Sequence, residues 1–227
     1  MICFVDIEHE KVLRDPQKRD AHLALCMDIK LKLEEVSGQP CLVQHYRQVS
    51  GQRLREWGME ALIISGSATD WDEYDKADLA GMYRIIQAAE LPILGFCGGL
   101  QLIALAYGVP LGPMRRLREG ESDPNAEFQP GYFKEWGFMP VRVLEPDPLF
   151  EGLGKEPVFF EAHYWEVKET PPHFRLLAST DECRIQAIKQ EDKLVYGTQF
   201  HPELYDQDHD DGRRLLANFF RLAGTVK

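Results

Sequence analysis

Residues 92–101 constrain the fold of this chain more than any other stretch. A short apolar run ends at Gly95, and Cys97 and two further glycines precede a helix-forming segment at residues 100–107. A strand that turns sharply into a helix has room only for small neighbours, and it projects its turn residue above the sheet. At a helix N-terminus, Cys97 would meet unpaired N–H groups and the positive end of the helix dipole, which favour the thiolate. The pattern predicts a nucleophile elbow with Cys97 as the nucleophile, although a buried cysteine in a glycine-rich turn would give the same local sequence.

Apolar strands and amphipathic helices alternate through the first half of the chain. Strands are expected at residues 1–6, 40–46, 61–65 and 92–95, and helices at 20–36, 52–58 and 74–90. The continuous apolar run at 61–65 is typical of a parallel strand that is covered on both faces. This alternation predicts an α/β fold with a doubly wound, mostly parallel sheet flanked by helices.

The helix at residues 20–36 is expected to bury a wide apolar face against the sheet. Its predicted stripe, including the residues that widen it, consists of Leu23, Leu25, Met27, Ile29, Leu31, Leu33 and Val36. We favour a core-facing stripe of this kind over a groove for a partner.

The second half of the chain changes character. Residues 115–132 are rich in charges, proline and glycine, which indicates a surface excursion placed to border the site. Short strands are expected at 138–143, 158–162, 174–178, 184–189 and 194–199, with a hairpin turn at 190–192 and a closing helix at 212–223. Because repeats and linkers are absent from the sequence, residues 1–227 are expected to form one domain.

Composition limits the partners that the chain can have. The 37 acidic residues outnumber the 26 lysines and arginines, so the net charge of −11 disfavours a nucleic acid or an acidic membrane as partner. Residues 1–6 are too short for a signal peptide, and no apolar run is long enough to span a membrane. Five scattered cysteines without a Cys-x-x-Cys pair fit reduced thiols in the cytoplasm.

A second motif supplies the partners that a reactive thiol needs. The last predicted strand runs into residues 197–203, where His201 is followed by a proline and then by Glu203. A histidine at the mouth of a strand can take the proton of a thiol and later protonate a leaving amine. A carboxylate two residues on can fix its tautomer.

Together, the two motifs resemble those of the class I (triad-type) glutamine amidotransferases. Residues 95–101 match the Gly-x-Cys-x-Gly-x-Gln motif of that family, and residues 197–203 match its Gly-x-Gln-Phe-His-Pro-Glu motif. Agreement extends to residues 65–66, 135–137 and 147–153, so the resemblance covers nearly the whole chain. It implies the flavodoxin-like fold of this family, with a Cys97–His201–Glu203 triad.

The resemblance also implies the chemistry. Cys97 would attack the side-chain amide of glutamine to form a γ-glutamyl thioester, and His201 would protonate the departing ammonia and then activate water. The backbone N–H of Gly98 would give one oxyanion donor, and each well-aimed donor typically stabilises the tetrahedral state by about 3 kcal/mol. Gln101 matches the family glutamine that helps to seat the substrate.

Two segments depart from the family pattern. After the third strand, relatives usually carry Gly-Gly-Pro or Asn-Gly-Pro, which supplies the other oxyanion N–H, whereas this chain has Gly66, Ser67 and an alanine. If Ser67 required a positive φ, this loop would be strained. His163 fits the segment whose backbone grips the α-groups of glutamine in relatives, but Tyr164 after it is bulkier than expected.

Three functions are compatible with these residues. The first is a stand-alone glutaminase that delivers ammonia to a separate synthase subunit, most similar to the GMP-synthase branch. The second is a γ-glutamyl hydrolase or peptidase with the same triad, which the bulk of Tyr164 and the excursion at 115–132 suggest. The third is a catalytically silent binding protein, whose basis is the departure at Ser67. The substrate is thus expected to be glutamine or another γ-glutamyl compound.

The sequence indicates neither a cofactor nor a metal site. It has no glycine-rich phosphate loop with lysine, so no ATP site is predicted. The acidic run at residues 206–211 offers possible metal ligands, but we interpret it as capping the last helix. For four further histidines we identify no partner in the sequence: His9, His22, His45 and His173.

Overall fold

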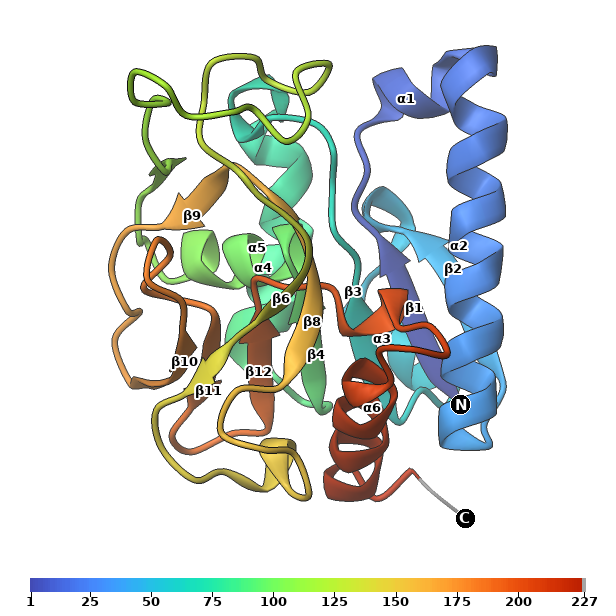
Figure 1. The fold of residues 1–227 in the computed structure, drawn as a ribbon. Coiled ribbons are helices and arrows are strands. Elements are labelled where there is room, and N and C mark those ends of the chain that lie inside the picture. The colour runs from blue at the N-terminus through green and yellow to red at the C-terminus, as the bar shows by residue number, and fades with distance from the viewer. Residues whose placement is uncertain (226–227) are drawn as a thin grey trace.

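An eight-stranded sheet forms the centre of the molecule in the computed structural model, which describes residues 1–225 (Figure 1). The strand order is β2-β1-β3-β4-β12-β11-β10-β7. The first five strands in that order are parallel: β2 (Cys41–His45), β1 (Ile2–Asp6), β3 (Ala61–Ile64), β4 (Ile93–Phe96) and β12 (Val195–Thr198). The other three are antiparallel: β11 (Ala187–Gln190), β10 (Phe174–Ser179) and β7 (Arg142–Val143). The predicted α/β fold with additional antiparallel strands is therefore confirmed.

Helices cover both faces of this sheet (Figure 1). The helices are α1 (Glu10–Arg14), α2 (Pro16–Ser37), α3 (Gly51–Glu56), α4 (Lys76–Ala88), α5 (Gly98–Ala106) and α6 (Asp211–Leu222). Short 3-10 helices occupy Tyr46–Gln48, Trp71–Glu73, Pro148–Phe150 and Pro202–Leu204.

Alternate residues of β1 pack into two separate hydrophobic cores, one on each face of the sheet. Cys3 and Val5 join a cluster that α3, α4 and α5 cover, whereas Ile2 and Phe4 join one that α2 and α6 cover. Successive side chains of a strand point to opposite faces, so a central strand buried on both faces must be apolar throughout. This explains the unbroken apolar runs of β1 and β3.

The predicted buried face of α2 is only partly correct. Ile29 and Leu33 are buried in the core together with Cys26. By contrast, Leu23, Leu25, Met27 and Leu31 are between 45% and 54% exposed. Only one side of α2 meets the sheet and α6, and side chains spaced by four residues along the neighbouring stripe turn away from it. Sequence periodicity identified a helix but assigned too wide a face to the core.

Several boundaries also differ from the sequence expectation. Between the strand expected at 1–6 and the helix expected at 20–36, the chain forms α1 and the first turn of α2, each capped by a side chain, from His9 and Asp15 respectively. The strand expected at 138–143 is divided into β6 (Glu135–Pro140) and β7. Two short strands were not predicted, β5 (Leu111–Pro113) and β9 (Trp165–Val167), which pair with each other.

The acidic run before α6 caps the helix less directly than expected. Asp210 is the N-cap residue, but its side chain makes no capping hydrogen bond. Asp211 lies in the first turn and accepts the backbone N–H of Val158 at the start of β8 (Val158–His163). The Asp206 carboxylate instead binds His209.

Parallel strands bring the ends of distant segments to one edge of the sheet. The carboxyl ends of β1, β3, β4 and β12 lie side by side, and the excursion between β5 and β6 loops above them at the top of Figure 1. Sites of α/β proteins form at such edges. Within residues 1–225, no helix has both the length and the apolar composition that crossing a membrane requires.

Candidate active site

Cys97 occupies a strained turn between β4 and α5. It is the N-cap residue of α5, with φ 46° and ψ −100°. Non-glycine residues rarely adopt such a conformation, and it persists only where the surrounding structure imposes it. A Cβ atom on the nearby Gly99 would lie 2.5 Å from the carbonyl oxygen of Ile64, so only glycine fits there. Crowding against β3 thus fixes the sharp turn, and the local geometry is that of a nucleophile elbow.

The pairing of β4 with β12 places His201 beside Cys97. The two strands run parallel, and the Cys97 N–H donates to the Thr198 carbonyl at 2.6 Å. His201 follows three residues later, and its backbone N–H donates to Phe160 of β8 at 2.8 Å. A Cβ atom on Gly66 would lie 2.8 Å from His201 Cε1 and 3.6 Å from Cys97 Cβ. The imidazole and the thiol therefore share one small space against the loop after β3.

Glu203 completes the predicted set of three residues. Its Oε1 lies 2.7 Å from His201 Nδ1, and the carboxylate is buried. Burial lowers the pKa of the His201 imidazole, but the charges of Glu203 and Cys97 and their hydrogen bonds outweigh burial, so the pKa is raised well above its ordinary value. The arrangement favours an imidazolium beside the thiol, as nucleophilic catalysis by cysteine requires.

Lys32 of α2 secures the segment that carries His201 and Glu203. Its Nζ donates to the backbone carbonyls of Glu203 at 3.1 Å and Tyr205 at 2.7 Å. The ammonium also lies 4.4 Å from the centre of the Tyr205 ring. Sequence reasoning did not identify this residue, because it is 171 positions from Glu203.

Gln199 is a further residue that the sequence analysis did not single out. Its side-chain amide is buried, and Nε2 approaches Cys97 Sγ at 3.4 Å. Its Oε1 accepts from Gln101 Nε2 at 3.2 Å. Gln101 also donates to the Trp165 carbonyl and accepts from Trp71 Nε1 at 2.7 Å. Gln101 therefore links the elbow helix to the walls of the site, and its own amide is engaged by protein groups.

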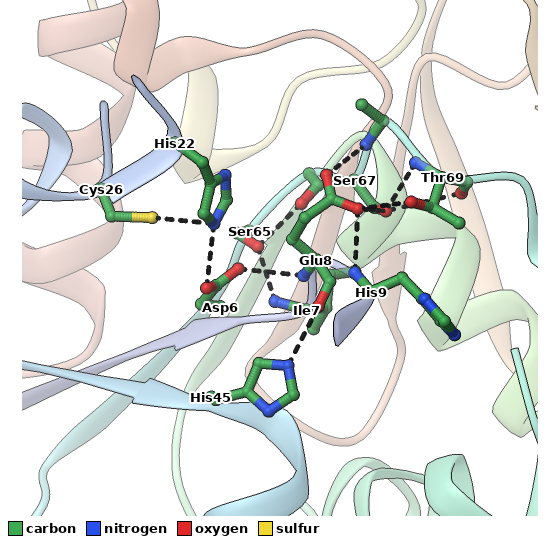
Figure 2. A network of polar contacts seen from close by, with 12 residues as sticks. Asp6, Ile7, Glu8, His9, His22, Cys26, His45, Ser65, Ser67 and Thr69 are labelled. Carbon is green, nitrogen blue, oxygen red and sulfur yellow. Dashed lines mark hydrogen bonds and ion pairs between the residues drawn. The ribbon is translucent and has the colours of Figure 1, made fainter. Parts of the chain in front are cut away.

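The loop at residues 66–69 is held in place by a carboxylate from β1's end. Glu8 accepts the Ala68 N–H at 2.8 Å and the Thr69 hydroxyl at 2.7 Å. The Ser67 hydroxyl also reaches Glu8, at 3.2 Å (Figure 2). Glu8 is buried, so these bonds replace the water that it gives up. A proline at position 68, as in the family pattern given under Sequence analysis, would have no N–H to offer this carboxylate.

The strain considered for Ser67 is not found. Among the described residues, the non-glycine positions with positive φ are Ala89, Cys97, Gln129 and His173. Serine is therefore compatible with the backbone of this loop. The Ser67 nitrogen lies 2.9 Å from the position of a Cβ atom on Gly98, so the two predicted oxyanion N–H groups are neighbours.

His163 uses its side chain away from the substrate space. Its Nε2 lies 3.0 Å from Glu135 and 3.2 Å from Glu161, and both carboxylates are buried. Burial lowers the pKa of the His163 imidazole, but the bonds to Glu135 and Glu161 have the larger, opposite effect. The resulting pKa is raised to about 10. What His163 can present to a substrate is therefore its backbone.

Tyr164 is fixed under the excursion. Its hydroxyl donates to Asp70, and its ring meets Phe128 and Tyr132, each with centroids 5.5 Å away. Burial and the Asp70 bond raise the pKa of the Tyr164 phenol. The expectation that residues 115–132 border the site is confirmed, because Phe128 lines both pockets described next.

Two pockets meet at this constellation. A narrow one of about 30 Å³ opens over Cys97 and is lined by Gln101, His163 and Tyr164, among others. A larger one of about 380 Å³ shares the lining residues Ser67 and Ala68 with the first and reaches His201 and Glu203. All the predicted site residues therefore lie around one centre.

Comparison with known proteins agrees with this geometry. The family described as Glutamine amidotransferase class-I matches residues 26–223. The chain belongs to the class-I glutamine amidotransferase family.

Its relatives include proteins that are named as one subunit of glutamine-hydrolysing GMP synthase. The one from Pyrococcus furiosus is 35% identical over 190 residues, covering 76% of this chain and 90% of that protein. The one from Pyrococcus abyssi is 38% identical over 136 residues, covering 60% of this chain and 62% of its relative. A solved structure of a protein from Thermoplasma acidophilum, proposed to be the same subunit of GMP synthase, has a TM-score of 0.72 at 25% identity, covering 99% of this chain and 94% of that one.

A more distant structure, a glutamine amidotransferase from Thermotoga maritima, shares the fold. Its TM-score is 0.63 at 14% identity, with 98% of this chain and 97% of that one covered.

Proposed function

We propose that this chain hydrolyses the side-chain amide of glutamine and supplies the ammonia to a separate synthase chain. The observation that carries the proposal is Cys97 at a strained elbow, beside an imidazole that Glu203 holds at 2.7 Å. The relatives that are named as a subunit of glutamine-hydrolysing GMP synthase support glutamine as substrate and a separate synthase chain as partner.

The first half of the reaction transfers the γ-glutamyl group to sulfur. The Cys97 thiolate attacks the side-chain carbonyl carbon of glutamine, a C–S bond forms, and the carbonyl electrons move to oxygen. The N–H groups of Gly98 and Ser67 stabilise this oxyanion, each by about 3 kcal/mol when well aligned. His201 gives its proton to the amide nitrogen, the C–N bond breaks, and ammonia leaves.

The second half releases glutamate. Water attacks the thioester while His201 takes a proton from it, and the C–S bond breaks to restore the thiolate. Glu203 keeps Nδ1 paired throughout, so that Nε2 faces the reaction. Glutamine would lie against Gln101, the backbone of His163 and the ring of Tyr164.

The state of the cysteines supports a reducing compartment. All five, Cys3, Cys26, Cys41, Cys97 and Cys183, are free and buried. We accordingly place the reaction in the cytoplasm.

Glutamate production from glutamine tests the proposal. The purified chain is assayed alone and with the synthase chain of a GMP synthase from the same genome. We expect activity that rises on addition of the synthase and that falls to background in Cys97→Ser. His201→Asn should slow alkylation of Cys97 by a glutamine-analogue chloroketone.

A panel of γ-glutamyl substrates separates the alternatives. A γ-glutamyl hydrolase would cleave γ-glutamyl dipeptides in preference to glutamine, and the aromatic wall of Phe128 and Tyr164 is the feature that would favour it. Preference for the dipeptides would overturn the glutaminase assignment. Inactivity towards every substrate, with the synthase present, would indicate a silent binding protein.

A further inference from the structure

A second cluster of reactive side chains lies beside the proposed active site. Asp6 is the last residue of β1, and His22 and Cys26 stand one turn apart on α2. Asp6 and Cys26 are buried, and His22 is partly buried between them. Figure 2 shows the His22 ring pointing to both partners, with the same nitrogen facing each.

The donor atoms are spaced like the corners of a metal site. His22 Nε2 lies 3.0 Å from Asp6 Oδ2 and 3.4 Å from Cys26 Sγ, and the three donor atoms all lie within 4.8 Å of one another. Tetrahedral zinc, with bonds of about 2.0–2.3 Å, holds its ligands about 3.3–3.7 Å apart. Little movement is needed to bring these atoms around one ion.

The chemistry of the three donors selects the ion. A thiolate and an imidazole nitrogen are borderline or soft ligands, which favour zinc over magnesium or calcium. Residues four apart on a helix share one face, so the spacing of His22 and Cys26 presents both ligands to the end of β1. Asp6 is oriented in advance, because its other oxygen, Oδ1, accepts the Glu8 N–H at 2.9 Å.

We propose that Asp6, His22 and Cys26 bind Zn²⁺, with the fourth position open to solvent or to a small ligand. The opening is the 380 Å³ pocket, whose lining includes His22 and Cys26 as well as His201 and Glu203. Three protein ligands and one open position distinguish reactive or exchangeable zinc sites from closed structural ones.

The other candidate cluster in the described chain is less suited to an ion. Glu135, His163 and Cys183 also lie within 4.8 Å of one another, but all three are buried. His163 Nε2 is already bound by Glu135 and Glu161. The Asp6 cluster, by contrast, is reached from a pocket, which gives an ion a path of entry.

Cobalt substitution tests the proposal on the full chain. The tests use a Cys97→Ser background, so that the proposed nucleophile cannot contribute a thiolate. Addition of one equivalent of Co²⁺ to chelator-treated protein should produce a thiolate-to-cobalt charge-transfer band and the strong visible bands of tetrahedral Co²⁺. Zn²⁺ should bleach both bands by displacing the cobalt.

Ligand variants identify the donors. Adding Cys26→Ser should abolish the charge-transfer band. Adding His22→Gln or Asp6→Asn should weaken Zn²⁺ binding by about 100-fold or more in competition with a chromogenic chelator. Mutating a residue that only hydrogen-bonds to a metal ligand already lowers metal affinity by about 10–100-fold. Adding Asp28→Asn, on an exposed position of the same helix, or Cys183→Ser, should leave binding unchanged.

Alkylation of Cys26 provides a readout that does not depend on the ligand variants being well folded. Zn²⁺ should slow modification of Cys26, followed by mass spectrometry, and leave that of Cys41 unchanged. The site would be refuted if the background protein bound no stoichiometric metal, if the charge-transfer band survived Cys26→Ser, or if Zn²⁺ did not protect Cys26.

Discussion

The carboxylate of Glu8 accepts the backbone N–H of Ala68 at 2.8 Å and so ties the end of β1 to the loop that follows β3 (Figure 2). The same carboxylate receives the hydroxyls of Ser67 and Thr69. A buried charge with several donors is a strong local constraint, because each charged hydrogen bond contributes about 1.5–3 kcal/mol. The position of the Ser67 N–H, the second proposed oxyanion donor, therefore depends on Glu8.

Glu8→Gln should reduce kcat/KM for glutamine by about 10-fold. The amide would place an NH₂ group against the hydrogen-bond donors of the loop, and the loop would move away. Transition-state stabilisation would then fall by part of the roughly 3 kcal/mol that one oxyanion donor contributes. Steady-state glutaminase assays measure the effect. Glu10→Gln, two residues away with its carboxylate bound to surface arginines, should behave like the parent chain. Equal activity of the two variants would show that Glu8 does not position the loop.

Gly66→Ala should lower kcat by about 100-fold. The added Cβ would lie 2.8 Å from His201 Cε1, so the imidazole must move away from Cys97. The rate of Cys97 alkylation and kcat should fall together, because both depend on the imidazole. Gly81→Ala is the matched control, since no atom beyond the adjacent backbone of α4 lies within 4 Å of a Cβ there and alanine suits the interior of that helix. An unchanged alkylation rate in Gly66→Ala would contradict the contact.

Lys32→Met should weaken both the fold and the site. The variant keeps an apolar stem over Tyr205 but loses the donors to the Glu203 and Tyr205 carbonyls. We expect the free energy of unfolding in urea to fall by about 1–3 kcal/mol and kcat to fall severalfold. Lys30→Met, which removes a partly exposed pair with Glu34, should cost less than about 1 kcal/mol and leave kcat unchanged. Similar effects of both variants would indicate a general helix effect.

The buried pair of His163 and Glu135 should make stability depend on pH. The folded-state pKa of His163 is raised to about 10, above the ordinary value near 6.5. A raised histidine pKa contributes stability that is complete below the unfolded pKa and is lost as pH rises through the folded pKa. Glu135→Gln should therefore lower the free energy of unfolding by about 3–5 kcal/mol at pH 6 and by less at pH 10.

Urea denaturation at the two pH values measures this difference. Glu169→Gln, an exposed change in the loop after β9, should shift stability by less than about 0.5 kcal/mol at both. A loss from Glu135→Gln that is equal at pH 6 and pH 10 would mean that His163 is neutral in the folded protein.

Periodicity and local motifs predicted most of the secondary structure. Each strand boundary in the first half differs from the sequence expectation by at most one residue, because apolar runs bounded by glycine or proline specify parallel strands strongly. The same reasoning predicted that Leu23, Met27 and Leu31 are buried, but they are exposed. Hydrophobic spacing identifies a helix, but which of its stripes meets the sheet depends on what packs against it.

The site itself was accessible from sequence only where its residues lie in a motif. Cys97, His201 and Glu203 were found because each belongs to a short pattern with a chemical meaning. Glu8 and Lys32 were not, since their partners are 60 and 171 residues away. Gln199 lies inside the second motif, but the sequence does not show its contact with Cys97, 102 residues away. The cluster of Asp6, His22 and Cys26 was missed although neighbouring members are only 16 and 4 residues apart, because the sequence does not show that the side of α2 with His22 and Cys26 faces the end of β1.

By itself, the sequence determined the alternation of strands and helices, the elbow at Cys97 and the chemical types that could form a triad. These properties are local, because they depend on residues within a turn or two of one another. The tertiary structure alone decided which carboxylate holds the oxyanion loop, which lysine secures the histidine segment and which side chains of α2 face the pocket. Those contacts arise where parallel strands bring remote segments to one edge of the sheet, and local spacing carries no information about that meeting.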